Sequence, residues 1–257
     1  MTVHSTAVVH PEAKLDPTVE VGPYAVIGGK VKLGPGTRVG PHAVIEGDTT
    51  IGARNRIFQF ASVGADPQDL KYAGEATKLV IGDDNLIREF TTLHIGTAGG
   101  GGTTRIGNKN LFMAYSHVAH DCVVGNGCVL ANSAALAGHV ELGDYVIMGG
   151  LTAVHQFTRI GKHAFIAGGA MVGMDVPPYC TAQGDRAELV GLNTVGLARH
   201  GFSEDQIARV KDAYKILFRS KLGLNEALSK LQAEHGGHSE IDHLIDFLNA
   251  SKRGVTR

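Results

Sequence analysis

The sequence predicts a mainly β protein: a coiled parallel β ladder with three short helices at its C-terminal end. An aliphatic residue recurs every six positions from Val9 to Val172, and a glycine directly follows many of these residues. A helical period replaces the repeat after about residue 190. Neither a helix nor an ordinary strand repeats every six residues, whereas a short strand followed by a sharp turn does. The chain is therefore expected to form a solenoid.

The six-residue repeat determines which residues stack on one another. One side chain per hexad should point inward, and the small residue after it lets the backbone bend. Three hexads close a triangular coil of 18 residues, so residues n and n+18 lie on parallel strands roughly 4.8 Å apart. A β-sandwich, with turns about every 8–12 residues, does not match. The repeat positions are Val9, Leu15, Val21, Ile27, Leu33, Val39, Ile45, Ile51, Ile57, Val63, Ile81, Ile87 and Leu93, then, shifted by one residue, Ile106, Phe112, Val118, Val124, Leu130, Leu136, Leu142, Met148, Val154, Ile160, Ile166 and Val172.

Composition argues against several classes of protein. The 257-residue chain has a net charge of −1, which argues against bulk nucleic-acid binding. It has no run of about 18 apolar residues that would span a membrane, and its first five residues lack the features of a secretion signal. The three cysteines, Cys122, Cys128 and Cys180, are few and odd in number, and the first two should diverge on consecutive faces. We expect a cytoplasmic protein with free thiols.

Two insertions interrupt the repeat, at about residues 66–78 and 97–103. Loops that leave a rigid scaffold often carry binding groups, although a tolerated surface insertion explains them as well. The second insertion contains four consecutive glycines, residues 99–102. No phosphate-binding motif accompanies this glycine run, so a plain surface loop is the simpler interpretation.

The repeat ends at Val176-Pro177-Pro178, and helical patterns follow. Ser203-Glu204-Asp205-Gln206 forms a capping box for a first helix. Asn225 is expected to cap a second helix and Ser239 a third. These helices would cover the strand edges at the open end of the last coil. We therefore predict a β-helix domain over residues 1–190 and a helical domain over residues 191–257.

Polar residues gather on the later coils. With the 18-residue spacing, Gly138 lies over His120 and His139 over Asp121, with His117 nearby and His155 and Gln156 on the next coil. A histidine titrates near pH 6.5, which suits removal of a hydroxyl proton at neutral pH. Asp121 would orient that histidine or bind substrate, and the Gly138 N–H would be open to an oxyanion. The patch predicts acyl transfer.

Two alternatives to acyl transfer are a metal site at the histidine cluster and a β-helix with no enzymatic role. Three histidines and a water form one class of zinc site, as in the hexapeptide-repeat carbonic anhydrases of the γ class. Those proteins usually carry less than a three-helix cap, and we expect no metal. A non-enzymatic β-helix scaffold would show flat rows of threonine, which the sequence does not contain.

Six further motifs, in order along the chain, resemble one family. They are Gln68-Asp69-Leu70-Lys71-Tyr72-Ala73-Gly74, Ala119-His120-Asp121-Cys122, Leu136-Ala137-Gly138-His139-Val140, Thr152-Ala153-Val154-His155-Gln156-Phe157, Asp175-Val176-Pro177-Pro178-Tyr179 and Arg199-His200-Gly201-Phe202-Ser203. Together they resemble the UDP-N-acetylglucosamine O-acyltransferases that begin lipid A synthesis. This set is far more specific than the hexad, which many acyltransferases share.

The resemblance implies a left-handed β-helix, a homotrimer and active sites between subunits. The implied reaction moves an (R)-3-hydroxyacyl group from acyl carrier protein to the glucosamine 3-hydroxyl of UDP-N-acetylglucosamine, with no cofactor beyond the carrier's phosphopantetheine. His120 would be the general base, Asp121 its supporting carboxylate and the Gly138 N–H the oxyanion donor. The substrate-binding residues would be Gln68, Asp69, Lys71, His117, His139, His155, Gln156, Asn193 and Arg199.

The sequence departs from the family in two places, at the acyl-chain ruler position and at His200, which stands where many members have a second arginine. A phosphate or carrier contact there would be weaker or pH-dependent. Gly168, at the family's acyl-chain ruler position, would admit a long chain.

Lys211, Lys215 and Arg219 share one helix face that would suit the acidic carrier protein, or is simply solvated.

Rival reactions on the same scaffold are an N-acyl transfer to a 3-amino sugar and a coenzyme A-dependent acetyl transfer. The N-acyltransferase that acts two steps later usually carries a domain before its β-helix. The repeat here begins by Val9, which leaves no room for one.

Overall fold

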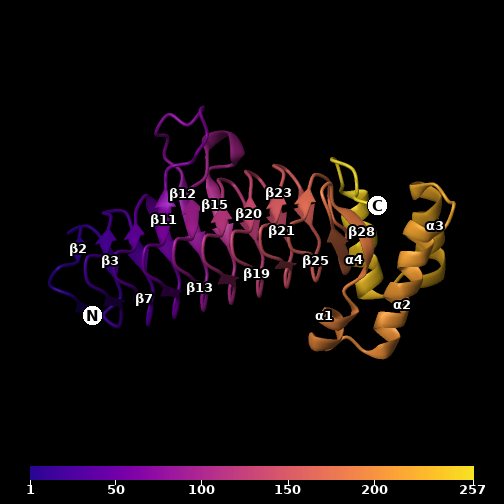
Figure 1. Ribbon diagram of the computed structural model, residues 1–257, viewed down its shortest axis with the longest axis horizontal. Coiled ribbons are helices and arrows are strands. Elements are labelled where there is room, and N and C mark those ends of the chain that lie inside the picture. The colour runs from indigo at the N-terminus through magenta and orange to yellow at the C-terminus, as the bar shows by residue number, and fades with distance from the viewer.

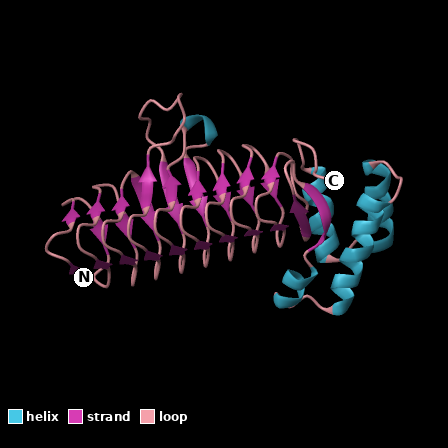
Figure 2. Cartoon of the chain, viewed as in Figure 1, coloured by secondary structure: helices cyan, strands magenta, loops and turns pink.

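The computed structural model describes residues 1–257, and most of the chain winds into a long parallel β-helix (Figures 1 and 2). Its strands form three sheets, one on each side of a triangular coil. Sheet A contains β1 (Thr2–Val3), β4 (Glu20–Val21), β7 (Arg38–Val39), β10 (Arg56–Ile57), β13 (Leu86–Ile87), β16 (Leu111–Phe112), β19 (Val129–Leu130), β22 (Ile147–Met148), β25 (Phe165–Ile166), β27 (Cys180–Gln183) and β28 (Glu188–Leu192).

The other two sheets complete the coil. Sheet B contains β2 (Val8–Val9), β5 (Val26–Ile27), β8 (Val44–Ile45), β11 (Ser62–Ala65), β14 (Thr92–His94), β17 (His117–Val118), β20 (Ala135–Leu136), β23 (Ala153–Val154) and β26 (Met171–Val172). Sheet C contains β3 (Lys14–Leu15), β6 (Lys32–Leu33), β9 (Asp48–Ile51), β12 (Lys78–Ile81), β15 (Thr103–Ile106), β18 (Val123–Val124), β21 (Glu141–Leu142) and β24 (Arg159–Ile160). Strands three apart in sequence pair in parallel along the β-helix, which confirms the predicted coil.

The core consists of the inward aliphatic columns that the repeat predicts. Val118 pairs with Leu136, and Leu136 with Val154, so these side chains stack along the axis. All three are 2% exposed or less. They belong to one cluster of 43 buried residues that runs the length of the β-helix. Since identical faces stack in register, each coil removes apolar surface of its neighbours from water.

Both insertions leave the scaffold without disturbing the register. Ser62 pairs directly with Thr92, and Thr92 with His117, although the intervening sequence is longer than one coil. The extra residues project at the edge between sheets B and C, where Figure 1 shows them as one protrusion. The second insertion contains a 3₁₀ turn, η1 (Ala98–Gly100).

The corners between sheets need a left-handed backbone, and many non-glycine residues adopt it. Asp121 has φ 59° and His139 has φ 61°, one coil apart on the same edge. This conformation costs a side-chain-bearing residue about 1–2 kcal/mol, which the stacked coils on either side offset. The corner geometry places both side chains outside the aliphatic core.

The C-terminal end is more complex than the sequence predicts. β27 joins sheet A beyond the two prolines and then forms an antiparallel hairpin with β28, which extends past the expected domain boundary at residue 190. The hairpin is missed because its strands carry no hexad. The helices are α1 (Thr194–Arg199), α2 (Glu204–Tyr214), a π-helical turn η2 (Lys215–Arg219), α3 (Leu224–His235) and α4 (Ser239–Asn249). The three predicted helices correspond to α2, α3 and α4, whereas the short α1 and the turn η2 were not predicted.

The helix starts are partly as predicted. Ser203 forms the expected capping box with Gln206. The caps assigned to Asn225 and Ser239 are wrong, because Gly223 and His238 occupy the N-cap positions and neither makes a side-chain cap bond. The helices pack around their own cluster of 13 buried residues, against which Leu224 lies. This packing rather than a local cap places the start of α3. None of the helices is long and apolar enough to cross a bilayer.

Candidate active site

The predicted catalytic residues lie together on the edge between sheets B and C. His120 and Asp121 follow β17, while Gly138 and His139 follow β20 on the next coil. The His139 N–H donates to the His120 carbonyl oxygen at 3.0 Å, which is the stacking that the 18-residue spacing predicts. Both insertions emerge from the same edge. The scaffold therefore brings one polar patch and two loops to one place.

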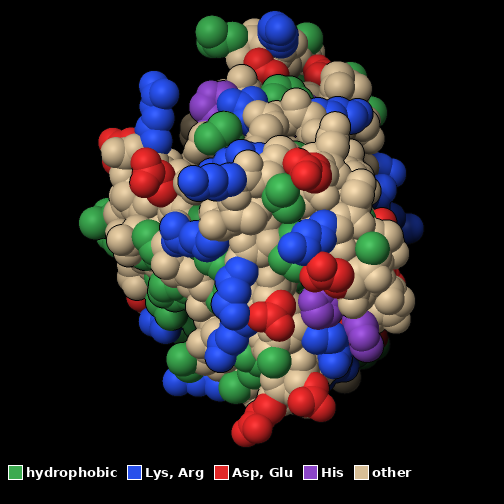
Figure 3. Space-filling view, turned by 90° about the vertical axis from the view of Figure 1, so that its right-hand side faces the viewer, with side chains coloured by type: hydrophobic (Ala, Val, Ile, Leu, Met, Phe, Trp, Pro, Cys, Tyr) green, Lys and Arg blue, Asp and Glu red, His purple; other side chains and the backbone are tan.

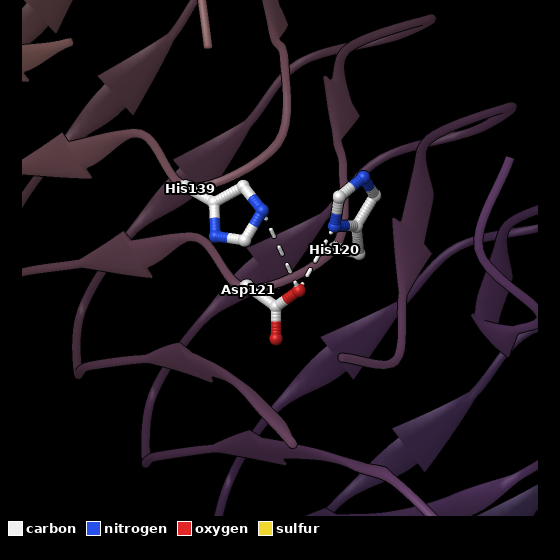
Figure 4. Close-up of side chains that lie close together, drawn as sticks. All are labelled: His120, Asp121 and His139. Carbon is white, nitrogen blue, oxygen red and sulfur yellow. Dashed lines mark hydrogen bonds and ion pairs between the residues drawn. The ribbon is translucent and has the colours of Figure 1, made fainter. Parts of the chain in front are cut away.

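His120 and Asp121 form a hydrogen-bonded pair (Figure 4). His120 Nδ1 lies 2.9 Å from Asp121 Oδ2, and the Asp121 side chain is fully buried. A carboxylate only accepts hydrogen bonds, so Nδ1 carries the proton and Nε2 is left with a free lone pair. The His120 side chain is 13% exposed, which leaves a path for a substrate hydroxyl. This is the arrangement of an oriented general base.

Two residues that hold Asp121 are missing from the sequence prediction. The Thr97 hydroxyl donates to Asp121 Oδ2 at 2.6 Å, and the Thr97 N–H lies 3.0 and 3.1 Å from the two carboxylate oxygens. Gly100 lies so close that an added Cβ would come within 2.0 Å of the Asp121 carboxyl carbon. The second insertion is therefore more than a tolerated surface loop. The sequence feature that could have identified this contact is a threonine at the start of an insertion that contains a run of glycines.

The His120 ring packs directly against the Cα of Gly138. A Cβ at this position would lie 2.5 Å from His120 Cε1 and 2.7 Å from Nε2, so only glycine fits beside the ring. The Gly138 N–H donates no hydrogen bond within the chain, while its carbonyl accepts from the Phe157 N–H at 3.1 Å. An N–H without a partner beside a base is available to an oxyanion.

His139 stands next to the pair. Its ring stacks on Phe157 at 4.3 Å between centroids and meets the His120 ring edge-on at 5.1 Å. Burial lowers the pKa of His139, and the nearby Asp121 and Asp69 carboxylates oppose that shift. Asp69, on the first insertion, is thus close enough to influence this ring.

Two further histidines lie beside this pair: His117 is on β17, the strand that leads to His120, and His94 is on β14, one coil before it. Thr92 Oγ1 is 2.7 Å from His117 Nδ1, and the rings of His94 and His117 meet edge-on at 4.9 Å. Burial, followed by the charge of His120, lowers the pKa of His117. Burial also lowers the pKa of His94 to about 4. The sequence analysis did not select His94, because this residue lies at the end of the last strand before an insertion and belongs to no recognisable motif.

The buried His94 makes the protein sensitive to acid. The unfolded chain binds a proton at this residue near pH 6.5, whereas the folded chain does so only near pH 4. Because the unfolded state binds more protons in between, stability should fall as the pH drops from about 6.5 to about 4. The melting temperature of His94→Gln should therefore fall less than that of the wild type between pH 7 and pH 5. An equal fall in both proteins would contradict this assignment.

The predicted residues of the first insertion lie on the same edge, and their side chains make few contacts with the rest of the chain. Gln68 and Lys71 are exposed, and Asp69 Oδ1 accepts from the Lys71 N–H at 3.0 Å. Glu75 joins the two insertions, because its Oε1 accepts from the Ala98 N–H at 3.2 Å. On the next coil, His155 and Gln156 are exposed. These side chains lie outside the aliphatic core.

Three predicted site residues lie on other edges of the same chain. Asn193 caps α1: its Oδ1 accepts from the Gly196 N–H at 3.0 Å, and its Nδ2 donates to the His163 carbonyl at 2.9 Å. Arg199 is exposed at the end of α1. Gly168 is exposed at a corner between sheets A and B, beside Gly150. The three edges of a triangular coil face different directions, so one chain does not bring these residues to His120.

An open cavity of about 830 Å³ adjoins the His120–Asp121 pair. Its lining includes Gly100, Asp121, His139, Phe157 and, from the C-terminal tail, Arg253. The ligand atoms of His120, Asp121 and His139 lie within 4.8 Å of one another, close enough for a metal ion. However, the Asp121 carboxylate already accepts from Thr97 and His120. The geometry is that of a hydrogen-bonded base.

The cysteine beside this pair is not arranged as a nucleophile. Cys122 is fully buried, and burial raises the pKa of its thiol to about 12. The thiol also donates to the Ala137 carbonyl at 3.1 Å. A thiol in this state is a poor nucleophile at neutral pH. All three cysteines are free and buried, which confirms that Cys122 and Cys128 do not pair.

The basic helix face at the cap end is largely engaged within the chain. Lys215 pairs with Asp212 at 3.0 Å, and Arg219 lies over the Tyr214 ring and donates to its hydroxyl. Figure 3 shows Lys and Arg side chains mixed with Asp and Glu over this end of the molecule. A single uniform basic field is absent from this face.

Comparison with known proteins points to one family. The family model described as UDP N-acetylglucosamine O-acyltransferase, domain 2, matches residues 175–256, and the bacterial transferase hexapeptide model matches residues 103–138. The acyl-[acyl-carrier-protein]–UDP-N-acetylglucosamine O-acyltransferase of Myxococcus xanthus is 73% identical over 255 residues, 99% of each chain. The protein of the same name from Anaeromyxobacter dehalogenans is 59% identical over 100% of both chains.

The fold agrees along the whole chain as well. The solved structure of the UDP-N-acetylglucosamine O-acyltransferase from Moraxella catarrhalis RH4 matches with a TM-score of 0.97 at 45% identity and covers 100% of both chains. The predicted left-handed parallel β-helix of hexapeptide repeats with a helical cap is thereby confirmed. Since relatives at 59–73% identity cover essentially every residue, the chain belongs to the family of acyl-carrier-protein-dependent UDP-N-acetylglucosamine O-acyltransferases.

Proposed function

We propose that this enzyme transfers an (R)-3-hydroxyacyl group from acyl carrier protein to the glucosamine 3-hydroxyl of UDP-N-acetylglucosamine, the first step of lipid A synthesis. The observation that carries the proposal is the His120–Asp121 pair at 2.9 Å beside the free Gly138 N–H. These are a base and an oxyanion donor on neighbouring coils, which acyl transfer from a thioester requires.

The mechanism follows from this geometry. His120 Nε2 takes the proton of the sugar 3-hydroxyl as its oxygen bonds to the thioester carbonyl carbon. Asp121 stabilises the imidazolium that forms, and the Gly138 N–H donates to the tetrahedral oxyanion. The carbon–sulfur bond then breaks, the carbonyl re-forms, and His120 returns its proton to the departing thiolate. Both substrates are held together, so no covalent acyl-enzyme is needed.

We propose that the functional unit is a homotrimer with its sites between subunits. Asn193, Arg199 and Gly168 lie on edges other than that of His120, so a neighbouring chain would have to supply them to the same cleft. There Asn193 and Arg199 would hold the UDP part, and Gly168 would line the acyl-chain end. Light scattering during size exclusion tests the trimer. A monomer with full activity would contradict it.

Several features support a location in the cytoplasm. The chain has three buried free thiols and no disulfide, as expected in a reducing compartment. Both proposed substrates would be met there. The exposed Lys211 and neighbouring basic residues of the cap remain a candidate contact for the acidic carrier protein.

One assay separates this reaction from its rivals. The purified protein is incubated with UDP-N-acetylglucosamine and a panel of 3-hydroxyacyl carrier proteins, and the product mass is measured. A 3-amino acceptor and an acetyl coenzyme A donor form the comparison arms. We expect an ester product from a carrier-bound donor. Absence of an acylated UDP-sugar at every chain length would contradict the proposal, and preference for the amino acceptor would redirect it to amide formation.

Removal of metal ions should leave the activity unchanged. In the proposed mechanism His120 supplies the base, Asp121 orients it and the Gly138 N–H holds the oxyanion, so no step depends on an ion. The measurement is kcat/KM before and after dialysis against a chelator, with metal content determined in parallel. Loss of activity that zinc restores would show that His120, Asp121 and His139 bind a catalytic ion instead.

A further inference from the structure

The last residues of the chain continue the β-helix from its end. Val255 pairs in parallel with Asp175, and Val176 pairs with Ile160 of β24, so the tail extends the ladder of sheet C. The Thr256 N–H donates to the Asp175 carbonyl oxygen at 2.8 Å. Asp175 itself is completely buried and accepts from the Ser251 hydroxyl at 2.8 Å. The tail is therefore firmly anchored where it passes the edge that carries the catalytic pair.

Arg253 reaches from this tail to His155. Its Nε donates to the Gly173 carbonyl oxygen at 2.9 Å, and its terminal nitrogen lies 2.9 Å from His155 Nδ1. A guanidinium has only donors and stays protonated, so His155 Nδ1 must be the acceptor. The proton of the neutral His155 ring is then on Nε2.

A second group competes for the same ring nitrogen. The backbone carbonyl oxygen of Gln156 lies 3.1 Å from His155 Nδ1. A carbonyl only accepts, so this contact becomes a hydrogen bond only when Nδ1 carries the proton. Arg253 and the Gln156 carbonyl thus favour opposite tautomers of His155. With Arg253 present, the charged donor outweighs the neutral acceptor.

We infer that Arg253 is a positioning residue that holds His155 in the tautomer with its proton on Nε2. His155 follows β23, directly beyond the coil of Gly138, and its side chain is exposed. In this tautomer Nε2 presents a hydrogen-bond donor to an acceptor oxygen of a substrate. Without Arg253 the proton moves to Nδ1, and Nε2 presents a lone pair instead. The effect on turnover rests on the proposed contact of His155 with substrate, whereas the tautomer does not.

Nitrogen-15 NMR of the imidazole rings tests the tautomer by itself. The His155 signals are identified by their loss in His155→Gln, at a pH where the ring is neutral. We expect a protonated Nε2 in the wild type and a shift of the proton to Nδ1 in Arg253→Ala. Arg257→Ala is the matched control, because it removes an exposed arginine from the same tail. An unchanged tautomer in Arg253→Ala would overturn the inference.

A double-mutant cycle tests the consequence for turnover. Arg253→Ala should lower kcat/KM about tenfold, the effect of one charge-assisted hydrogen bond. In the His155→Ala background the same substitution should cost nothing further, because Arg253 acts through His155. Equal losses in both backgrounds would show that Arg253 serves only to dock the tail, which overturns the positioning role. Full activity of His155→Ala would instead contradict the proposed substrate contact and leave the NMR result to decide the tautomer.

Discussion

Replacement of His120 by alanine is expected to lower kcat by at least about 10²-fold, the low end for loss of a general base. The residue is the only group that joins an accessible ring nitrogen to the buried Asp121 carboxylate at 2.9 Å and lies against Gly138. Its loss removes the proton acceptor but little of the core, since the aliphatic columns are untouched. Steady-state kinetics with a carrier-bound 3-hydroxyacyl donor gives the measurement.

His10→Ala serves as the control for this substitution. His10 lies on the same edge of the β-helix, where its ring packs against Gly29 on the next coil, far from the site. That variant should keep wild-type turnover, and circular dichroism should show both variants folded. Near-normal turnover of a folded His120→Ala would remove His120 from the mechanism.

Gly100→Ala is expected to lower kcat by roughly 10–10²-fold although residue 100 bears no functional group. The new Cβ would come within 2.0 Å of the Asp121 carboxyl carbon, so the carboxylate must move. Movement of Asp121 strains its bonds to Thr97 and releases the His120 ring from its orientation. Displacement of a catalytic group by about 1 Å costs up to about 10²-fold. The effect should appear in kcat more than in KM.

The neighbouring glycine offers a matched control. A Cβ on Gly99 meets nothing within 4 Å, so Gly99→Ala should retain wild-type kcat while it changes the same loop by the same methyl group. Thermal melting of both variants reports whether the β-helix is intact. If Gly99→Ala and Gly100→Ala lose activity equally, the loop acts through its flexibility rather than through contact with Asp121.

The six-residue repeat predicted which site residues are neighbours, because its geometry is local and repetitive. Coils without an insertion have the same length, so a constant offset of 18 brings Gly138 to the His120 ring and His139 to Asp121. The two insertions do not change which strands stack, since they project from one edge and the strand register resumes beyond them. The sequence motifs that resemble the family agree with what the whole-chain comparisons later show.

The predictions that failed depend on packing rather than on the repeat. The N-cap of α3 is Gly223 and not Asn225, because burial against the cap cluster outweighs a local capping side chain. The hairpin of β27 and β28 pairs residues with no periodic pattern. Asn193 caps α1, a structural role that no sequence motif reveals, and its predicted contact with the UDP part stays a prediction.

The sequence by itself determined the coil, its axial neighbours and the base–carboxylate–glycine set, because these depend only on a fixed number of residues per turn. Tertiary structure alone decided what holds that set in place. Thr97 and Gly100 reach Asp121 from an insertion, and Arg253 reaches His155 from the far end of the chain. Such contacts join segments whose separation follows no period, so they arise only when the folded scaffold brings loop, tail and corner to one edge.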